Sequence, residues 1–300
     1  MNGKRLLFRL TARCNSGCEH CTLTDIAHLP DRGLEEACTL LAQARKRGCS
    51  ELVIMRGEAT ILAPELVHLI QHATNLGYGL IQLQTNGRML AYSKLVNRLL
   101  RAGLNAVELS FFGHTPELHD AIDGVPGAYH QVRAAIAELC KLSVPLMVTI
   151  PIIRKNHHHL ADIVEHLHQM GVQRVQLNFS RPMSLTEAVP GGVNVTLAET
   201  AVHLVSAVRR GRQMGLEIQT EAFPLCLLPS ELHDGIDSSE TLGEHEVIDL
   251  HRQDLNAQGG AHPLMGHAPT CHACTLRPCC PGTWTTYITA HGDRELQSIG

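Results

Sequence analysis

The sequence has no excess of basic residues, no long apolar run and no secretion signal, and each absence excludes a class of protein. The net charge is −4 with the histidines neutral, so the chain has no basic footprint for nucleic acid and no electrostatic attraction to a membrane surface. No window reaches the roughly 20 apolar residues that cross a bilayer. The opening stretch MNGKRLLFRL has no long apolar core and no small-residue cleavage site, so it is not a signal peptide. We therefore expect a cytoplasmic protein with no nucleic-acid partner and no membrane partner.

The number of cysteines is odd, which argues against a framework of disulfide bonds. The chain has eleven, and a cytoplasmic chain does not normally form disulfide bonds. Cys38, Cys49 and Cys140 stand singly in apolar surroundings, where a thiol behaves as a small buried hydrophobe. The clustered cysteines are better interpreted as metal ligands or catalytic groups.

Apolar runs of strand length alternate with segments of helical periodicity over residues 5–214. Strands are expected at Arg5–Thr11, Glu51–Met55, Leu80–Thr85, Ala106–Phe112, Leu146–Ile152 and Arg174–Ser180. Helices are expected at Gly33–Arg47, Pro64–Asn75, Tyr92–Arg101, Ala128–Lys141, His158–Met170 and Leu197–Met214. Strand–helix units in this order predict a parallel sheet with right-handed crossovers.

Several of these strands alternate polar and apolar residues instead of being apolar throughout. Because side chains alternate between the two faces of a strand, the polar residues line one side of the sheet and the apolar ones suit packing against helices. The polar set is Arg56, Glu58, Gln82, Gln84, Asn86, Glu108, Ser110, Gln176, Asn178 and Ser180. A polar concave face beneath an outer layer of helices describes an incomplete TIM-type barrel with a usable interior. The alternative is an antiparallel sheet with one solvent-exposed face, and the helices between the strands argue against it.

The regular pattern stops after the helix that ends near Met214. Between Phe223 and Pro269 the sequence is polar and rich in Gly, Pro, His and Asp, which predicts a long loop with at most short helices. A second group of cysteines follows in TCHACTLRPCCPGTW. We therefore expect two parts, a barrel core in residues 1–215 and a small irregular C-terminal extension in residues 216–300.

Three of the clustered cysteines stand in ARCNSGCEHCTL, directly after the first apolar run. The spacing C-x3-C-x2-C places Cys14, Cys18 and Cys21 on one short loop, where three thiolates can converge on one metal centre. A structural zinc site uses four protein ligands, usually as two pairs. A cubane iron–sulfur cluster can be held by three cysteines, which leaves its fourth iron open to a small molecule. The cluster is the favoured interpretation, with zinc or free thiols as the alternatives.

This loop resembles the hallmark of radical S-adenosylmethionine (SAM) enzymes, a C-x3-C-x2-C motif after the first strand of a partial (β/α)6 barrel. In that family an aromatic residue usually precedes the third cysteine and packs near the adenine, and here that residue is His20. The stretch RGEAT resembles the family's G-G-E-P motif, which holds the SAM amino group. Gly57 and Glu58 match it, whereas Arg56 and Ala59 replace the first glycine and the proline.

The resemblance continues through the later strands and covers about residues 5–215. The stretch QTNG is similar to the family's third-strand ending, and VELSFFGHTPELHDAIDGVPGAY resembles its fourth strand and the loop that follows. The resemblance implies cofactor-binding positions at His20, Gly57, Glu58, Thr85, Asn86, Ser110 and Asn178.

The resemblance also implies a specific chemistry. Three irons of a [4Fe–4S] cluster are bound by cysteine, and the fourth chelates the amino and carboxylate groups of SAM. An electron from the cluster breaks the sulfur–C5′ bond, which gives methionine and a 5′-deoxyadenosyl radical that abstracts hydrogen from the substrate. A strongly reducing donor such as flavodoxin or ferredoxin is implied as a partner.

Cys271, Cys274 and Cys280 form a second motif, C-x2-C-x5-C, in the C-terminal part. This motif resembles the SPASM and Twitch extensions of many radical SAM enzymes, which bind auxiliary [4Fe–4S] clusters. The few cysteines available favour one auxiliary cluster and a Twitch-like extension. Cys226 is the favoured fourth ligand because it directly follows the barrel, whereas Cys279 adjoins Cys280 and neighbouring residues rarely point at one metal. A structural zinc site with the same four cysteines is the alternative.

Twenty histidines also invite a metal interpretation. The three consecutive histidines at 157–159 open a helix, where neighbouring residues face different directions, so we expect no shared ligation. His114 and His119 follow the fourth strand, on the side where a barrel carries its site, and either could contact substrate. Better candidates for a substrate-facing interior are Arg56, Gln82, Glu108, Gln176 and Asn178. The sequence assigns no residue a proton-transfer or other catalytic role.

The expected function is that of a radical SAM enzyme acting on a peptide or a small molecule, in natural-product biosynthesis or peptide modification. We expect no peptide-recognition domain before the barrel, since the first strand begins near residue 5. A peptide leader would then need a separate partner or the segment Phe223–Pro269. The alternatives are a SAM-dependent methyl or aminocarboxypropyl transferase that uses the same cluster, and a non-catalytic zinc-binding protein.

Overall fold

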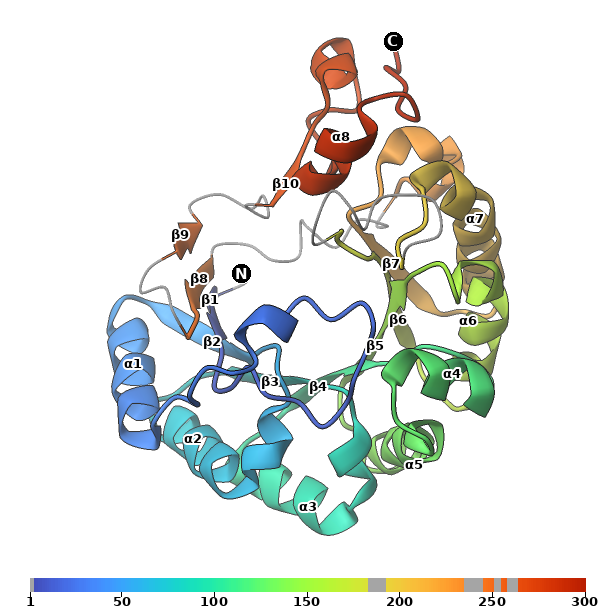
Figure 1. Ribbon diagram of the computed structural model, residues 1–300. Coiled ribbons are helices and arrows are strands. Elements are labelled where there is room, and N and C mark those ends of the chain that lie inside the picture. Colours follow the sequence, from blue (N-terminus) through green and yellow to red (C-terminus); the bar gives the residue numbers. More distant parts are fainter. Residues whose placement is uncertain (1–2, 183–192, 235–244, 251–254, 258–263) are drawn as a thin grey trace.

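The computed structural model describes residues 3–182, 193–234, 245–250, 255–257 and 264–300. Its main feature is a curved sheet with helices on the outer side (Figure 1). The strands are β1 (Lys4–Phe8), β2 (Cys49–Ile54), β3 (Leu80–Thr85), β4 (Ala106–Ser110), β5 (Leu146–Ile152), β6 (Arg174–Phe179), β7 (Glu217–Glu221), β8 (His245–Ile248) and β9 (Leu255–Ala257). Their order is β7-β6-β5-β4-β3-β2-β1-β8-β9. Strands β1 to β8 are parallel and β9 runs antiparallel to β8.

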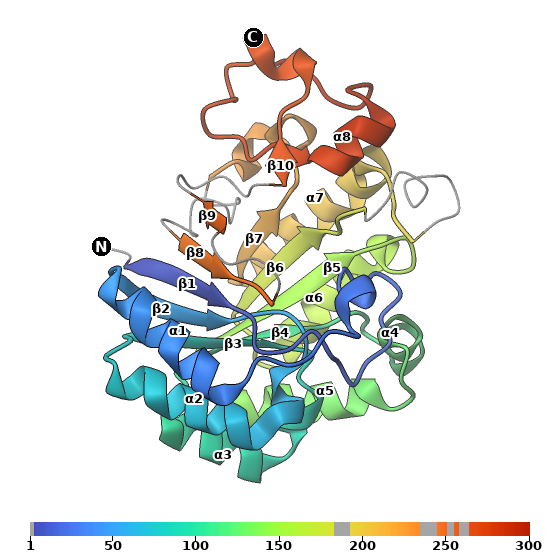
Figure 2. The ribbon, with the colours of Figure 1, turned by 60° about the vertical axis from the view of Figure 1, so that its left-hand side comes forward.

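Helices follow most of the strands and cover the convex side of the sheet (Figures 1 and 2). They are α1 (Leu34–Lys46), α2 (Ala63–Asn75), α3 (Ser93–Ala102), α4 (Pro116–Asp123), α5 (Ala128–Lys141), α6 (Leu160–Gln169), α7 (Leu197–Gln213) and α8 (Thr285–His291). The predicted partial TIM-type barrel is therefore confirmed, and the bounds of β3, β5 and α5 agree with those expected. None of the helices in the described ranges is both long and apolar enough to cross a membrane.

The alternation of polar and apolar residues decides which face of the sheet is covered. Val175, Leu177 and Phe179 of β6 are buried in the main core beneath the helices, as their parity predicts. On the opposite face, Glu108 of β4 accepts hydrogen bonds from Gln82 Nε2 at 2.9 Å and Gln84 Nε2 at 3.0 Å. Pairing across the strands satisfies these polar groups, so the interior of the barrel stays polar without unpaired carboxamides at these positions.

Helix α4 was not expected, although the sequence contains its start signal. The Thr115 side chain accepts a hydrogen bond from the Leu118 backbone N–H at 3.3 Å, and Pro116 occupies the first helical position. The helix is only eight residues long, which is too short for its periodicity to stand out. Its C-terminal end lies against the cysteine loop, because the Gly17 N–H donates to the Asp123 carbonyl at 2.9 Å.

Three strands of the main sheet, β7, β8 and β9, come from the segment after residue 215. Strand β7 pairs with β6, and β8 pairs with β1 on the other side of the sheet. The prediction of a loop with at most short helices over 223–269 is wrong for β8 and β9, whose residues form strands. Strand β8 has four residues flanked by acidic and histidine side chains, so its extended conformation depends on pairing with β1. The other parts of that segment include residues 235–244, 251–254 and 258–263, which lie outside the described residues.

The C-terminal extension packs beside β7 and α7 (Figure 2). Its two short strands, β10 (Met265–Gly266) and β11 (Thr283–Trp284), form an antiparallel pair. Trp284 is buried, and its indole N–H donates to the carbonyl of Phe179 at the end of β6. The Leu197 N–H at the start of α7 donates to the Tyr287 hydroxyl at 2.9 Å. These contacts join the extension to the barrel, and the division of the chain at residue 215 stays a prediction.

A buried carboxylate joins β8 to β1 and α1. Glu246 of β8 receives hydrogen bonds from Lys4 Nζ at 2.6 Å and from Arg47 Nη2 at 2.8 Å. Burial by itself would raise the pKa of Glu246, but the hydrogen bonds from Arg47 and Lys4 outweigh it and lower that pKa. A depressed pKa means that the carboxylate stabilises the fold above its unfolded pKa, and that this stability is lost as the pH falls through the folded value.

We predict that Glu246→Gln destabilises the protein by roughly 1–3 kcal/mol at pH 7, because a buried charge-assisted contact is lost. The matched control is Glu217→Gln, whose exposed pair with Arg174 contributes roughly 0–1 kcal/mol. The side chain of Glu246 is 6% exposed and that of Glu217 is 53% exposed. Urea unfolding of both variants is measured at pH 7 and at roughly pH 3.5. The lower pH is chosen because the carboxyl group of an unfolded glutamate has a pKa of about 4.3. The deficit of Glu246→Gln should shrink at the lower pH, and an equal deficit at both would contradict the ion-pair explanation.

Candidate functional site

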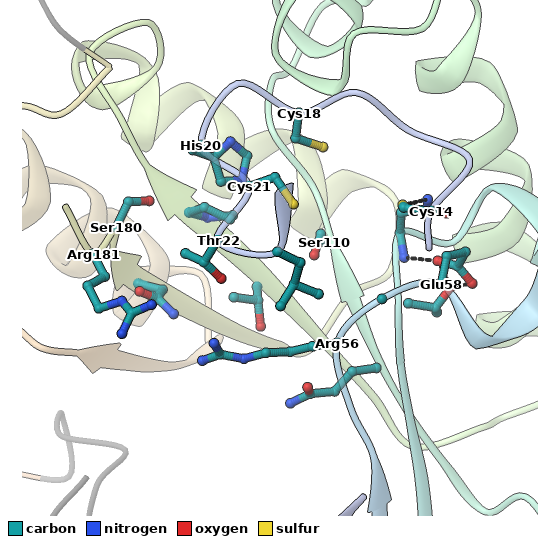
Figure 3. Close-up of a pocket in the computed structure, with 18 of the residues that line it drawn as sticks. Cys14, Cys18, His20, Cys21, Thr22, Arg56, Glu58, Ser110, Ser180 and Arg181 are labelled. Carbon is teal, nitrogen blue, oxygen red and sulfur yellow. Dashed lines mark hydrogen bonds between the residues drawn. The ribbon is translucent and has the colours of Figure 1, made fainter. Parts of the chain in front are cut away.

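A cavity of about 260 Å³ lies at the carboxyl ends of the parallel strands (Figure 3). This is the end at which barrels of this kind carry their sites, because the loops that follow the strands converge there. The cavity is lined by residues of the loop after β1 and by the ends of five further strands. These lining residues include Cys14, Cys18, His20, Cys21, Arg56, Gly57, Glu58, Thr85, Asn86, Ser110, Pro151, Asn178, Ser180 and Arg181. All seven predicted cofactor-binding residues are thus in the lining.

The three N-terminal cysteines stand together on one wall of this cavity. Cys14, Cys18 and Cys21 all line it, and Figure 3 shows their sulfur atoms facing a common space. The loop turns tightly between the second and third, where the Cys21 N–H donates to the Cys18 carbonyl at 3.1 Å. The sulfur of Cys14 accepts from the Ser16 N–H at 3.4 Å, a contact that stabilises a thiolate.

Asn86 holds the cysteine loop against the end of β3. Its side-chain amide donates to Asn15 Oδ1 at 2.7 Å and to Ser16 Oγ at 3.0 Å, and it lies 3.6 Å from the Cys14 sulfur. Arg88, two residues further on, donates to the Asn15 carbonyl. The structure therefore places Asn86 at the cavity as a support for the ligand loop.

The number of thiols distinguishes between two kinds of metal centre. A structural zinc site is almost always closed by four protein ligands. A [4Fe–4S] cluster held by three cysteines keeps its fourth iron open to a small molecule. Three thiols that face one space (Figure 3) therefore fit a [4Fe–4S] cluster better than a structural zinc site.

Burial sets the charge state of these thiols. It raises the pKa of Cys14 and, more strongly, that of Cys18, so both stay protonated in the absence of a metal. The Asp123 carboxylate adds to the effect at Cys18 through its negative charge. Thiolate ligation therefore needs a cationic centre whose charge offsets the desolvation, and metal binding here releases protons.

The backbone after β2 takes a conformation that glycine adopts most readily. Gly57 has a φ of +70°, and a Cβ atom there would lie 2.0 Å from the Thr11 carbonyl oxygen. Arg56 has a φ of +47° although it is not a glycine, so the chain keeps the shape of a glycine pair with an arginine in the first position. The side chain of Arg56 extends into the cavity (Figure 3).

Glu58 is completely buried beneath the cavity wall. Its carboxylate accepts hydrogen bonds from the Thr85 hydroxyl at 2.9 Å and from the Asn86 N–H at 2.8 Å, and it also accepts from Thr60. Burial raises the pKa of Glu58, and these hydrogen bonds oppose that shift. The structure thus places Glu58 and Thr85 where they join the ends of β2 and β3.

His20, Ser110 and Asn178 surround the space beside the cysteines. The His20 ring lies 5.2 Å from the Phe112 ring in an edge-on arrangement, and burial lowers the pKa of His20 to about 4, so the ring is neutral. Asn178 donates its amide N–H to Glu221 of β7, which fixes the orientation of its carbonyl. These neutral groups form an uncharged wall.

The cavity also contains residues that the sequence analysis did not select. Arg181 follows β6, and Figure 3 shows its guanidinium group on the same side of the cavity as that of Arg56. Trp284 and Leu264 come from the extension and close the cavity from that side. The parity of β6 could not have placed Arg181 in the cavity, because it gives Arg181 the helix-facing side of Leu177 and Phe179. Nothing near Trp284 in the sequence indicates that it reaches the barrel.

A second cavity gathers the remaining cysteines. Cys226, Cys271, Cys274 and Cys280 all line it, whereas Cys279 is exposed and its thiol donates to the Leu276 carbonyl at 3.3 Å. Backbone N–H groups point at two of the sulfurs, from Leu225 to Cys280 and from Ile299 to Cys274, each at 3.4 Å. Burial raises the pKa of Cys226 and of Cys280. The four thiols therefore fit a metal centre as a set.

The histidines singled out after the fourth strand do not line the main cavity. His119 is fully buried between Phe111, Phe112 and Tyr129, and burial lowers its pKa to about 4. His114 lies against the ring of His159 on the outside of the barrel. The expectation that His157 and His158 diverge is wrong, because their rings meet with Nε2 and Nδ1 3.1 Å apart.

Residues 8–167, just over half of the chain, match the family model described as "Radical SAM superfamily". The chain is 27% identical over 184 residues to an AdoMet-dependent heme synthase of Methanosarcina barkeri, a match that covers 60% of this chain and 52% of that protein. It is 29% identical over 176 residues to a PqqA peptide cyclase of Rhizobium meliloti, covering 57% of this chain and 46% of that protein. The chain thus spans about half the length of these relatives.

Solved structures share the fold at low sequence identity. The structure titled "Native anSMEcpe with bound AdoMet and Kp18Cys peptide" has a TM-score of 0.60 and 16% identity, and covers 69% of this chain and 59% of that one. The crystal structure of SuiB from Streptococcus suis has a TM-score of 0.60 and 14% identity, and covers 84% of this chain and 63% of that one. These likenesses show the fold.

Gly57 provides a direct test of the loop packing. We predict that Gly57→Ala strains the turn by about 1–3 kcal/mol, because a left-handed alanine is unfavourable and its Cβ would meet the Thr11 carbonyl. The control is Gly33→Ala, at a position with a φ of −61° and no atom within 4 Å of the added Cβ. Thermal melting and the iron content of anaerobically reconstituted protein report the result. Equal behaviour of the two variants would contradict the close approach.

Proposed function

This chain belongs to the radical SAM superfamily, and on that premise we propose that it is an enzyme that cleaves SAM reductively and abstracts hydrogen from a substrate. The observation that carries the proposal is the trio of Cys14, Cys18 and Cys21, whose sulfurs face one space at the carboxyl ends of the strands. These three cysteines would hold a [4Fe–4S] cluster, which would supply the electron for reductive cleavage of SAM.

The residues around the trio would bind and orient SAM. The turn at Arg56–Glu58 lines the cavity, and Gly57 has no side chain to cover its backbone groups. His20 offers the flat neutral ring that suits an adenine, and Phe112 supports it from the side. Ser110 and Asn178 supply hydroxyl and carboxamide groups for the polar parts of SAM. Trp284 and Leu264 limit the access of water from the extension side.

We propose a peptide or small-molecule substrate in natural-product biosynthesis or peptide modification. Two of the similar proteins support a peptide substrate, because one is named a peptide cyclase and the other was solved with a bound peptide. Arg56 and Arg181 place positive charge on one side of the cavity, which suits a carboxylate, either that of SAM or one on the substrate. A flavodoxin- or ferredoxin-type electron donor and a cytoplasmic location stay predictions.

We also propose one auxiliary [4Fe–4S] cluster in the extension, bound by Cys226, Cys271, Cys274 and Cys280. The shared cavity, the N–H groups directed at two of the sulfurs and the exposure of Cys279 support this ligand set. A structural zinc ion bound by the same four cysteines is the alternative, and metal analysis distinguishes the two.

We predict that replacement of Cys14, Cys18 or Cys21 by serine lowers the iron content from about eight to about four per chain, on the rule of four irons per cubane. The same variants should produce no 5′-deoxyadenosine from SAM with dithionite, while the control Cys38→Ser keeps both properties. Anaerobic iron and sulfide analysis with chromatography of the SAM products measures them. A colourless wild-type protein with stoichiometric zinc would overturn the proposal, and SAM turnover without 5′-deoxyadenosine would indicate methyl or aminocarboxypropyl transfer.

Two serine variants test which cysteine is the fourth ligand of the auxiliary cluster. We expect Cys226→Ser to lose about four irons per chain while the SAM-binding cluster remains, and Cys279→Ser to keep about eight. The reason is that Cys226 lines the cavity, whereas Cys279 does not and its thiol donates a hydrogen bond to the Leu276 carbonyl. Iron analysis with electron paramagnetic resonance of the reduced proteins distinguishes the clusters. Loss of iron in Cys279→Ser alone would assign the ligand to Cys279.

A further inference from the structure

Outside the barrel, histidines from two different elements meet on a surface that the proposed chemistry does not use. His157 and His158 belong to a short 3-10 turn, η4 (His157–His159), that leads into α6. His203 lies on α7, which packs beside that turn. None of the three lines the main cavity. Their ring nitrogens lie within 4.8 Å of one another, which makes them one of the groups of potential metal ligands among the described residues.

The rings of His157 and His158 meet although the two residues are neighbours in the sequence. The ring centroids of His157 and His158 lie 4.1 Å apart at 68°, and their facing nitrogens are 3.1 Å apart. Two imidazole nitrogens bound to one tetrahedral zinc ion lie about 3.3 Å apart, given Zn–N distances of about 2.0–2.1 Å. The two rings are therefore already close to the spacing of ligands on a common ion. The ring of His203 completes the group at 5.4 Å from that of His157.

His157 is oriented as metal-binding histidines are. Its Nδ1 lies 2.9 Å from the Arg154 carbonyl oxygen, which can only accept a hydrogen bond. The Nδ1 atom must therefore carry the proton, and Nε2 accepts a hydrogen bond from His158 Nδ1–H at 3.1 Å. A metal ion would displace that proton and take the Nε2 lone pair. A backbone carbonyl that fixes the tautomer in this way is the usual outer partner of a ligating imidazole. His157 is also buried, so packing holds the ring in place.

The surroundings suit a cation that solvent can reach. His158 is exposed and His203 is half-buried, so an ion can enter from the surface and keep a water ligand. Glu199, one helical turn before His203, carries a negative charge close to His157. Its carboxylate oxygen accepts hydrogen bonds from the Thr196 N–H and hydroxyl, each at 3.0 Å, so it contributes charge from a fixed position.

We propose that His157, His158 and His203 form a binding site for a divalent transition-metal ion of the zinc type, separate from the cysteine centres. Neutral imidazoles suit zinc, copper, iron and nickel, whereas magnesium and calcium require oxygen ligands. Three protein ligands leave a coordination position for water. The ion would connect the turn before α6 to α7, and it would therefore stabilise the side of the barrel formed by β6 and its helices.

A neighbouring group provides the matched control. His114, His159 and Asp162 also place their ligand atoms within 4.8 Å of one another. The pair His159–Asp162 is a surface contact of 3.7 Å between two residues of one helical turn. No carbonyl contact comparable to that of His157 orients its rings among the described residues. A variant at His159 alters the same turn without removing a proposed ligand.

The test uses protein whose cysteines are already occupied by reconstituted iron–sulfur clusters, so that thiols do not compete for the probe. Zinc is titrated alone, against a chromogenic chelator, and the thermal midpoint is recorded with and without zinc. We expect the wild-type protein to bind one zinc ion per chain and to melt at a higher temperature with it. His203→Ala and the exposed His158→Ala should each bind zinc about tenfold more weakly or worse, on the scale reported for perturbed metal sites. His159→Ala should bind like the wild type.

Three results would overturn the proposed zinc site. Wild-type protein that binds no zinc, or that binds it equally after His203→Ala and His158→Ala, overturns the proposal. Loss of binding in His159→Ala alone assigns the ion to the neighbouring group and also overturns it. Circular dichroism of the zinc-free variants controls for misfolding, and His158 is exposed enough that its replacement should leave the fold intact. Because the variants differ only at histidines, any zinc bound by cysteines would be the same in all of them. The comparison between variants therefore holds whether or not the proposed function is correct.

Discussion

The buried carboxylate of Glu58 organises the site. It lies beneath the cavity wall at the end of β2, and it accepts hydrogen bonds from Thr85 and from the Asn86 backbone at the end of β3. Asn86 in turn holds the loop that carries Cys14. Removing this charge from water costs free energy unless every lone pair finds a donor, so the donors around it must stay in place together. The positions of the three sulfur atoms therefore depend on a group that does not touch them.

The two cysteine sets lie in different structural settings. The first stands on a loop that Asn86 holds against the end of β3, and it faces the cavity at the carboxyl ends of the strands. The second joins Cys226, which directly follows the barrel, to three cysteines near the C-terminus. A centre bound there would link the extension to the barrel, next to the contacts of Trp284 and Tyr287 with β6 and α7. Trp284 reaches the main cavity from this side, so the extension contributes to both settings.

Much of the barrel could be predicted because it depends on local patterns. The six predicted strands and their helices follow from apolar periodicity, and the polar interior follows from the alternation along each strand. Strand β8 could not be found in this way, since its four residues resemble the polar segment around them and become a strand through pairing with β1. Helix α4 had a recognisable start at Thr115 and Pro116 but was too short for its periodicity to show. The divergence expected of His157 and His158 failed because the backbone direction of a residue does not fix where its ring ends, and the two rings meet through Nε2 and Nδ1.

The sequence alone determined the ligand types and their local spacing. Three thiols within eight residues, the glycine at 57 and the parity of the polar side chains are properties of short segments, and short-range geometry constrains them. Only the tertiary structure decided which distant residues meet. Cys226 joins Cys271, Arg181 joins Arg56, and His203 joins His157 because strands and helices far apart in the chain pack side by side. That packing arises from the burial of many apolar side chains at once, a collective effect that no single motif records.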